Sequence, residues 1–190
     1  MHHEDVVPLS LPPWPLTPPA HGGVLLRQVR VEDADMAREL STDPYVPETG
    51  SLPLNASGEE AVAWVRRQQG RHAEGAGFSL TIVARATGEA VGHCGLWLGG
   101  LGNGRATAGY ALVPSARGRG LATDALTALT GFGWTLPGLL RIELYIEPWN
   151  AGSIRVAQRA GYTCEGLLRG HRVIGGRRRD LLLYAVVRPG

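Results

Sequence analysis

One unit of the sequence restricts the possible folds more than any other: a strand, a glycine-rich loop, a helix and a second strand. We predict strands over residues 105–113 and 139–147. Between them we predict a helix over residues 121–134, because Leu121, Ala125, Leu126 and Leu129 share one face. A helical crossover of this kind requires the two strands to lie parallel in one sheet.

The remaining elements extend this unit on both sides. The pattern predicts strands over residues 24–31, 78–85, 89–98, 162–169 and 179–187, and helices over 33–40, 57–70 and 152–160. Asp33 and the capping box of Ser57 and Glu60 mark two helix starts, and the prolines of residues 43–54 indicate a loop. We expect an α/β (α+β) fold with a mixed, mostly antiparallel sheet of about seven strands and helices on both faces.

The length of 190 residues suits one domain with a substantial core. Residues 8–19 hold six prolines around Trp14, which excludes a regular helix or a central strand there. We therefore expect a proline-rich N-terminal arm over residues 1–22, lying on the domain or on a partner subunit, and a single domain over residues 23–190.

Composition excludes several classes of function. Two cysteines make neither a disulfide framework nor a zinc cluster, so we expect no metal. No apolar run approaches the roughly 20 residues of a membrane span, and the start lacks a signal peptide, so we expect a cytoplasmic protein without membrane contact. A net charge of +2 disfavours nucleic-acid binding, and the three arginines of 177–179 are typical of a solvated hairpin tip.

The loop after residues 105–113 indicates an anion site. Gly118 and Gly120 allow the backbone to approach a ligand closely, and Arg117 and Arg119 add positive charge. The start of the next helix supplies free amides and a partial positive charge, so the segment can hold a pyrophosphate. The spacing fits neither a P-loop nor the dinucleotide fingerprint. On spacing alone, a tight turn with two solvated arginines explains it equally well.

Motifs across the chain resemble those of one enzyme family. Arg117-x-x-Gly120-x-Ala122 after a strand resembles the cofactor motif of the GNAT family of N-acetyltransferases. Further matches to its RimJ/RimL-like branch follow in register: Arg141-Ile142-Glu143, Asn150-Ala151-Gly152-Ser153, Ala160-Gly161-Tyr162, Glu165-Gly166 and Asp180 with Tyr184. The resemblance covers about residues 24–187 and leaves the proline-rich arm outside.

The resemblance implies acetyl-coenzyme A (acetyl-CoA) as cosubstrate, held where the two parallel strands splay apart. It places the pantetheine arm along Leu112 and Val113, with a backbone amide near Val113 polarising the thioester, and Asn150 at the pantetheine end. It places the pyrophosphate on the amides of Arg117, Gly118, Arg119, Gly120, Leu121 and Ala122.

The same resemblance assigns the leaving thiolate to Ser153, whose alternative role is to cap the helix at 152–160. It makes Glu143 a base that acts through water, the alternative being an ion pair with Arg141. His93 and His171 remain further candidates for the base, although a structural histidine is the commoner case.

The acceptor is an amine of undetermined kind. The branch acetylates protein N-termini, but a polyamine or an amino-sugar antibiotic fits the motifs equally well. Asp43 and Glu48 in the loop at 43–54 hint at a cationic acceptor. Two other interpretations remain open, a non-catalytic acyl-CoA-binding module and an arginine- and glycine-rich RNA binder. A homodimer is possible for such a domain.

Overall fold

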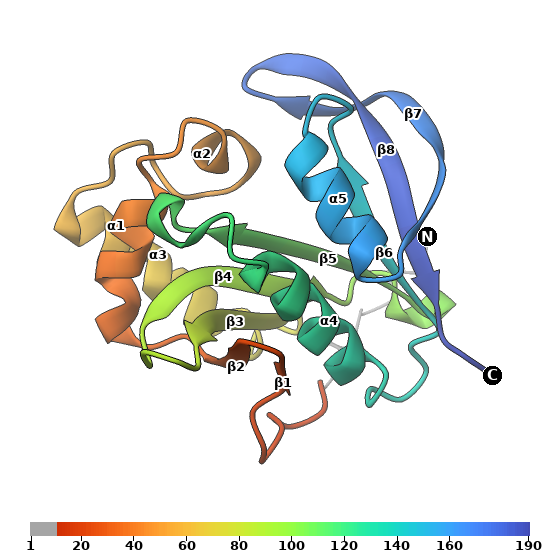
Figure 1. The fold of residues 1–190 in the computed structure, drawn as a ribbon, viewed down its shortest axis with the longest axis horizontal. Coiled ribbons are helices and arrows are strands. Elements are labelled where there is room, and N and C mark those ends of the chain that lie inside the picture. The colour runs from red at the N-terminus through yellow and green to blue at the C-terminus, as the bar shows by residue number, and fades with distance from the viewer. Residues whose placement is uncertain (1–10) are drawn as a thin grey trace, which may run out of the picture.

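We describe the fold from a computed structural model, which covers residues 11–190. Its centre is an eight-stranded sheet in the order β1-β2-β3-β4-β5-β6-β8-β7 (Figure 1). The strands are β1 (Ala20–His21), β2 (Val24–Gln28), β3 (Gly77–Ala84), β4 (Ala90–Trp97), β5 (Arg105–Leu112), β6 (Arg141–Ile146), β7 (Thr163–Ile174) and β8 (Arg177–Val187).

All neighbouring strands run antiparallel except β5 and β6, which run parallel as the crossover predicts. The predicted mixed, mostly antiparallel sheet is confirmed. The short β1 lies within the predicted proline-rich arm and adds an edge strand that we did not predict. Residues 77–84 of β3 are buried throughout, as expected for a strand covered on both faces.

The α-helices are α1 (Ala34–Leu40), α2 (Val46–Thr49), α3 (Gly58–Gly70), α4 (Leu121–Gly133) and α5 (Ala151–Arg159). They cover both faces of the sheet, as Figure 1 shows. Gly133 of α4 lies against Leu96 of β4, whereas Trp64 of α3 packs edge-on against His93 of β4, which points to the opposite face. No described helix is long and apolar enough to cross a bilayer.

The helix starts follow the sequence with one correction. Ser57 accepts a hydrogen bond from the Glu60 amide and Glu60 accepts one from Ser57, which confirms the capping box of α3. The prediction that Asp33 caps α1 is wrong for its side chain, which makes no capping hydrogen bond. Its buried carboxylate instead accepts hydrogen bonds from Arg27 and Thr81, which tie α1 to the sheet.

The segment at 43–54 also differs from the prediction, because it contains the four-residue helix α2 rather than only a loop. Asp43 explains why, since its carboxylate accepts from the amides of Tyr45 and Val46 at 2.7 and 3.1 Å. α2 faces α5 in the upper half of Figure 1, and the Tyr45 ring before α2 packs against that of Trp149 before α5.

The described part of the predicted arm lies on its own domain. The Trp14 ring packs against His72 and Phe78, with ring centroids 4.9 and 5.2 Å apart. Nε2 of His72 lies 2.8 Å from the Pro12 carbonyl oxygen. Residues 11–14 of the arm therefore pack against the core of this chain, and residues 1–10 lie outside the described part.

The feature that positions the site is the divergence of β5 and β6. Their parallel pairing covers only Arg105–Thr107 against Arg141–Glu143, although β5 continues to Leu112 and β6 to Ile146. Beyond residue 107 the backbone of β5 is bonded only on its β4 side, and a gap opens in the sheet.

Candidate active site

Two cavities meet at this gap. The first, here called the α4 cavity, has a volume of about 680 Å³ and lies at the start of α4, beside α5. The second, the β4 cavity, has a volume of about 530 Å³ and lies among β4, the ends of α2 and α3, and the β7–β8 hairpin. Both cavities are lined by Tyr45, Val46, Thr49, Tyr110, Ala111, Asn150 and Ser153. This shared wall gives two ligands a place to meet.

The α4 cavity presents free backbone amides. Gly118 and Gly120 have φ values of +77° and +79°, a conformation that other residues rarely adopt, and Gly120 is the N-cap of α4 without a side-chain cap. Within the described residues, the amides of 118–122 donate no hydrogen bond outside the helix. Gly120, Leu121 and Ala122 line the cavity, so this wall is suited to an anionic group.

The two arginines of the loop behave differently from a solvated pair. Arg117 lines the cavity, but its guanidinium donates to the Leu112 carbonyl at 3.0 and 3.2 Å and pairs with Asp43 at 2.6 Å. Arg117 therefore anchors the loop, and its charge is partly neutralised by Asp43 before any ligand binds. Arg119 lies outside the lining, with its Nε 3.5 Å from the Ala116 carbonyl.

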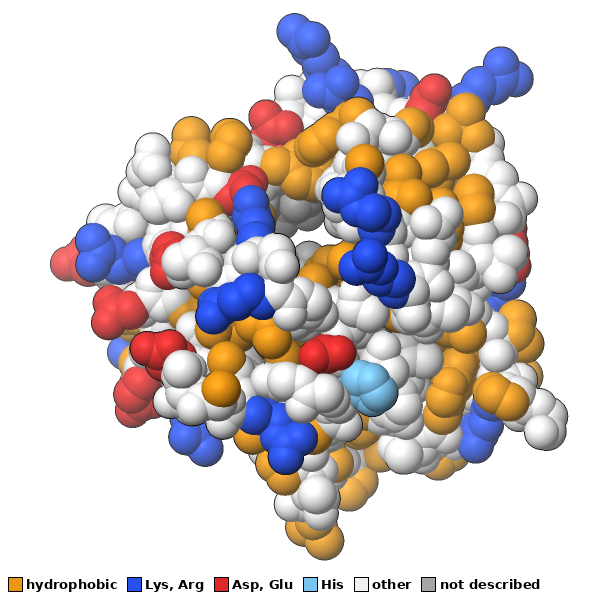
Figure 2. Space-filling model, viewed as in Figure 1, with side chains coloured by type: hydrophobic (Ala, Val, Ile, Leu, Met, Phe, Trp, Pro, Cys, Tyr) orange, Lys and Arg blue, Asp and Glu red, His pale blue; other side chains and the backbone are white. Residues whose placement is uncertain are grey.

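Positive charge comes instead from α5, which sequence reasoning missed. Arg155 and Arg159 are exposed and line the α4 cavity. Their spacing of four residues places both on one helical face, a signal that the sequence did contain. Figure 2 shows a hollow near the middle of the molecule with arginine side chains on both sides.

Asn150 and Ser153 share the wall between the cavities. Asn150 is the N-cap of α5, because its Oδ1 accepts a hydrogen bond from the Ser153 amide at 3.0 Å. The cap is therefore Asn150 and not Ser153, whose hydroxyl takes no part in it. Its hydroxyl is available to a ligand in either cavity.

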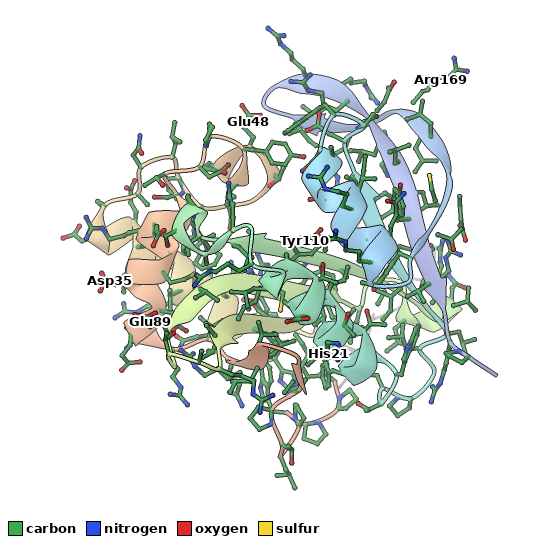
Figure 3. The ribbon with its side chains drawn as sticks, viewed as in Figure 1. His21, Asp35, Glu48, Glu89, Tyr110 and Arg169 are labelled. Carbon is green, nitrogen blue, oxygen red and sulfur yellow. The ribbon has the colours of Figure 1, made fainter. Side chains whose placement is uncertain are left out.

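Tyr45 and Tyr110 also line both cavities, and no local sequence pattern pointed to either. Figure 3 shows Tyr110 in the central region between β5 and α5, and its hydroxyl donates to the Ser153 carbonyl at 3.4 Å. Burial raises the pKa of Tyr110 to about 12, so this hydroxyl keeps its proton at neutral pH. Burial and the nearby Glu147 also raise the pKa of Tyr45, which packs edge-on against Trp149.

The backbone of β5 corrects one expectation. The Val113 amide donates to the Val91 carbonyl at 3.0 Å, so it is not free to polarise a thioester. In an antiparallel pair alternate residues turn their polar groups away from the partner strand. Since Val113 faces β4, the amides of Leu112 and Tyr110 point towards the gap, and both residues line the α4 cavity.

Glu143 is not at the cavities. Its buried carboxylate accepts hydrogen bonds from Arg141 at 2.7 Å and from the Tyr145 hydroxyl at 2.8 Å, with Arg105 3.9 Å away. Burial acts to raise its pKa, but these partners outweigh burial and hold the pKa below its usual range. The ion pair with Arg141, considered above as the alternative to a base, is what the structure contains.

The histidines are also placed. His93 lines the β4 cavity, and its Nε2 lies 2.6 Å from the Ser79 hydroxyl, which donates to Gln68. Burial lowers the pKa of His93 to about 4, so the ring is neutral and a weak base at physiological pH. His171 stacks on Tyr145 with ring centroids 5.1 Å apart.

A helix start with free amides beside one cavity, and a second cavity across a shared wall, are features that suit a two-substrate transferase with a phosphorylated cosubstrate. The comparison with known proteins identifies the class. Residues 24–163 match the acetyltransferase (GNAT) domain, and the chain belongs to this family. It is an N-acetyltransferase whose cosubstrate is acetyl-CoA.

Relatives cover nearly the whole chain. The uncharacterized N-acetyltransferase p20 of Bacillus licheniformis is 30% identical over 163 residues, which is 86% of this chain and 92% of p20. RimJ of Mycobacterium smegmatis, solved with CoA-disulfide, is 28% identical with a TM-score of 0.74 over 86% of this chain and 81% of that one. RimL, a ribosomal L7/L12 alpha-N-protein acetyltransferase solved with coenzyme A, shares the fold at 21% identity and a TM-score of 0.73 over 89% and 96% of the chains.

Proposed function

We propose that acetyl-CoA binds in the α4 cavity and that the acceptor amine enters through the β4 cavity, so that the acetyl group is transferred at their shared wall. The observation that carries this proposal is the set of residues lining both cavities at the point where β5 and β6 diverge. A thioester lying there is accessible from both sides of the sheet.

The cosubstrate contacts follow from the walls of the α4 cavity. We assign the pyrophosphate to the amides of 118–122 and to Arg155 and Arg159, which supply exposed positive charge in the cavity wall. The pantetheine arm then runs along Leu112 and Tyr110, whose amides are not paired with β6, while the Leu112 carbonyl accepts from Arg117. The Asn150 carboxamide, with its oxygen committed to the α5 cap, can offer its NH₂ group to the same arm.

The reaction is direct attack of the amine nitrogen on the thioester carbonyl carbon. A carbon–nitrogen bond forms, the carbon–sulfur bond breaks, and coenzyme A leaves as the thiolate. We assign polarisation of the carbonyl to a backbone amide of the β5 edge, because such a fixed donor stabilises the developing oxyanion. We assign to the Ser153 hydroxyl the hydrogen bond to the departing sulfur, with the protonated Tyr110 hydroxyl beside it.

No side chain is assigned as the general base. Glu143 is bound by Arg141 and has a lowered pKa, and the pKa of His93 is about 4, so neither is suited to take a proton at neutral pH. In this proposal the amine enters in its neutral form or loses its ammonium proton to water in the open β4 cavity. The proton that the nitrogen sheds after the attack passes to the departing thiolate or to water.

For the acceptor we propose the N-terminus of a protein or peptide. The β4 cavity is open to solvent and long enough to reach from the shared wall past β4 to the β7–β8 hairpin, as an extended chain requires. The description of RimL as an alpha-N-protein acetyltransferase supports the same acceptor class.

The test combines binding and turnover. Acetyl-CoA is titrated calorimetrically into the protein, and free thiol release is then followed with short peptides that have a free or a blocked N-terminus. We expect one-site micromolar binding, and thiol release only with the free N-terminus. Binding without thiol release for any free amine would contradict the transfer step, and absence of binding would contradict the placement of the cosubstrate.

A further inference from the structure

The side chains of the β4 cavity are positively charged on balance. Among its lining residues are two arginines, Arg71 and Arg172, and the neutral His93, but no aspartate or glutamate. Carboxylates near the cavity are already paired: Glu147 is buried and lies 3.5 Å from Arg179. A cationic acceptor group would therefore meet uncompensated positive charge.

The acidic residues that hinted at a cationic acceptor are placed elsewhere. Asp43 pairs with Arg117 and lines the α4 cavity, not the β4 cavity. Glu48 lies against Gly175 at the hairpin, and Figure 3 shows it at the edge of the molecule on α2. Neither carboxylate lines the space that the acceptor would occupy.

The two arginines are held by aromatic rings that also line the cavity. The Arg71 guanidinium lies over Trp97, with Cζ 5.9 Å from the ring centroid, and that of Arg172 lies 5.8 Å from the centroid of Tyr145. Stacking of this kind orients a guanidinium and leaves its N–H groups free for an anion. Tyr145 is itself fixed, because its hydroxyl donates to Glu143 and His171 stacks on its ring.

The hydrogen bonds of these arginines are incomplete. The Nε of Arg71 is buried and has no hydrogen-bond partner, and its ion pair with the exposed Glu74 is long, at 3.8 Å. Arg172 forms no ion pair within residues 11–190. Buried donors are normally satisfied, so the unpaired Nε shows that residues 11–190 leave the Arg71 fork incomplete. The Nη groups of both arginines have no close carboxylate partner among these residues. A carboxylate matches the fork of an arginine in shape and charge.

We propose that the acceptor is a primary amine that carries a carboxylate, bound by Arg71 and Arg172 while the amine reaches the shared wall. This inference rests on the proposed entry of the acceptor through the β4 cavity and names its chemistry. The carboxylate belongs either to an acidic side chain near the N-terminus of a peptide or to a free amino acid.

The experiment compares acceptors that differ in one charge. The peptides Ser-Asp-Phe-amide and Ser-Asn-Phe-amide form one pair, and phenylalanine with its amide forms the other. We expect kcat/KM to be at least about tenfold higher for the charged member of one pair, as for a charge-assisted hydrogen bond. The pair that shows the preference identifies the source of the carboxylate. Equal rates within both pairs, with transfer observed, would overturn this inference and leave the proposed function intact.

Variants assign the preference to the two arginines. Arg71→Gln and Arg172→Gln should each reduce the preference severalfold through the acceptor KM, with the KM for acetyl-CoA unchanged. Arg172→Glu should favour Ser-Lys-Phe-amide over the acidic peptide. The matched control is Arg177→Gln, which removes the same charge from an exposed hairpin residue outside the cavity. A preference that survives both glutamine variants, or that is lost equally in the control, would contradict the assignment.

Binding is measured separately, so that a failure of transfer is distinguishable. The N-acetylated peptides are titrated into the protein saturated with coenzyme A. We expect tighter binding of the acidic product even if turnover is slow. Indistinguishable affinities of the acidic and neutral products would overturn the inference whatever the result for transfer.

Discussion

The two cavities that meet at the splayed strands are walled in different ways. The α4 cavity presents backbone amides of residues 118–122 and the open edge of β5, whereas the β4 cavity presents side chains such as Arg71, Trp97 and Arg172. In the proposed arrangement, backbone groups bind the pyrophosphate and pantetheine of acetyl-CoA, a cosubstrate that does not vary. Side chains can be exchanged without changing the fold, so the β4 cavity is where acceptor specificity can vary.

The first way to test this contrast is to damage the backbone wall. Gly120→Val places a branched side chain at φ +79°, in open space that we assign to the pyrophosphate. We expect acetyl-CoA affinity to fall at least about 100-fold, because two or more charge-assisted hydrogen bonds of about 1.5–3 kcal/mol each are lost. Calorimetric titration measures this loss.

The matched control for Gly120→Val is Gly88→Val. Gly88 has φ +76° and open space around it, but it lies in the turn between β3 and β4. Both variants should lose similar stability, about 1–3 kcal/mol, from the same backbone strain. If Gly88→Val lowers the affinity for acetyl-CoA as much as Gly120→Val does, the loss arises from impaired folding and the placement of the pyrophosphate is wrong.

The same contrast explains what the sequence could predict. Periodicity, the capping box of Ser57 and the glycines at 118 and 120 are local signals. They predicted the parallel pair and the order of elements apart from β1 and α2, and they indicated the glycine-rich wall to which we assign the pyrophosphate. Side-chain pairing between distant segments is not local. The ion pair of Arg117 with Asp43 joins residues 74 apart, and it makes Arg117 an anchor of the loop as well as a residue of the cavity wall.

Tyr110 and Arg71 illustrate the same limit. Tyr110 lies inside a predicted strand, but its importance depends on where β5 parts from β6, which a single sequence does not encode in any local pattern. Arg71 ends α3 and faces the cavity only because α3 packs beside β4. The pair of Glu143 and Arg141 lay within reach of sequence reasoning, since residues two apart share one face of a strand.

The second prediction concerns the shared wall. Ser153→Ala should lower kcat about 10- to 100-fold, because one hydrogen bond to the departing thiolate is lost, and should leave the KM for acetyl-CoA within about twofold. Steady-state kinetics with a saturating acceptor measures both. Tyr110→Phe is the companion variant, and a larger loss of kcat there would transfer the thiolate role from Ser153 to Tyr110.

The third prediction couples the two cavities. Asp43 binds Arg117 of the α4 cavity and holds α2, which borders both cavities, through the amides of Tyr45 and Val46. Asp43→Asn keeps these amide bonds but loses the ion pair. We expect the KM values for acetyl-CoA and acceptor to rise together by about threefold, the size of a partly exposed pair. A rise in only one of them would show that the walls are independent.

The smallest expected effect on activity is that of Glu143→Gln. Because Glu143 lines neither cavity and is bound by Arg141, we expect kcat to remain within about threefold of the parent at neutral pH. If Glu143 were the general base, its replacement would lower kcat far more, by about 100-fold or greater. Stability is the property that should change, by about 1–3 kcal/mol, since the half-buried donors of Arg141 and Tyr145 lose a charged acceptor.

The pH dependence of this loss distinguishes an ion pair from a general weakening of the fold. The folded-state pKa of Glu143 lies below its usual value of 4.5, so the carboxylate stabilises the fold above that pH and loses its contribution as pH falls through the folded pKa. Glutamine does not titrate. The difference in Tm between parent and Glu143→Gln should therefore be largest near neutral pH and shrink below about pH 4.5. A difference that stays constant down to pH 3 would mean that packing around Glu143, and not its charge, stabilises the paired ends of β5 and β6.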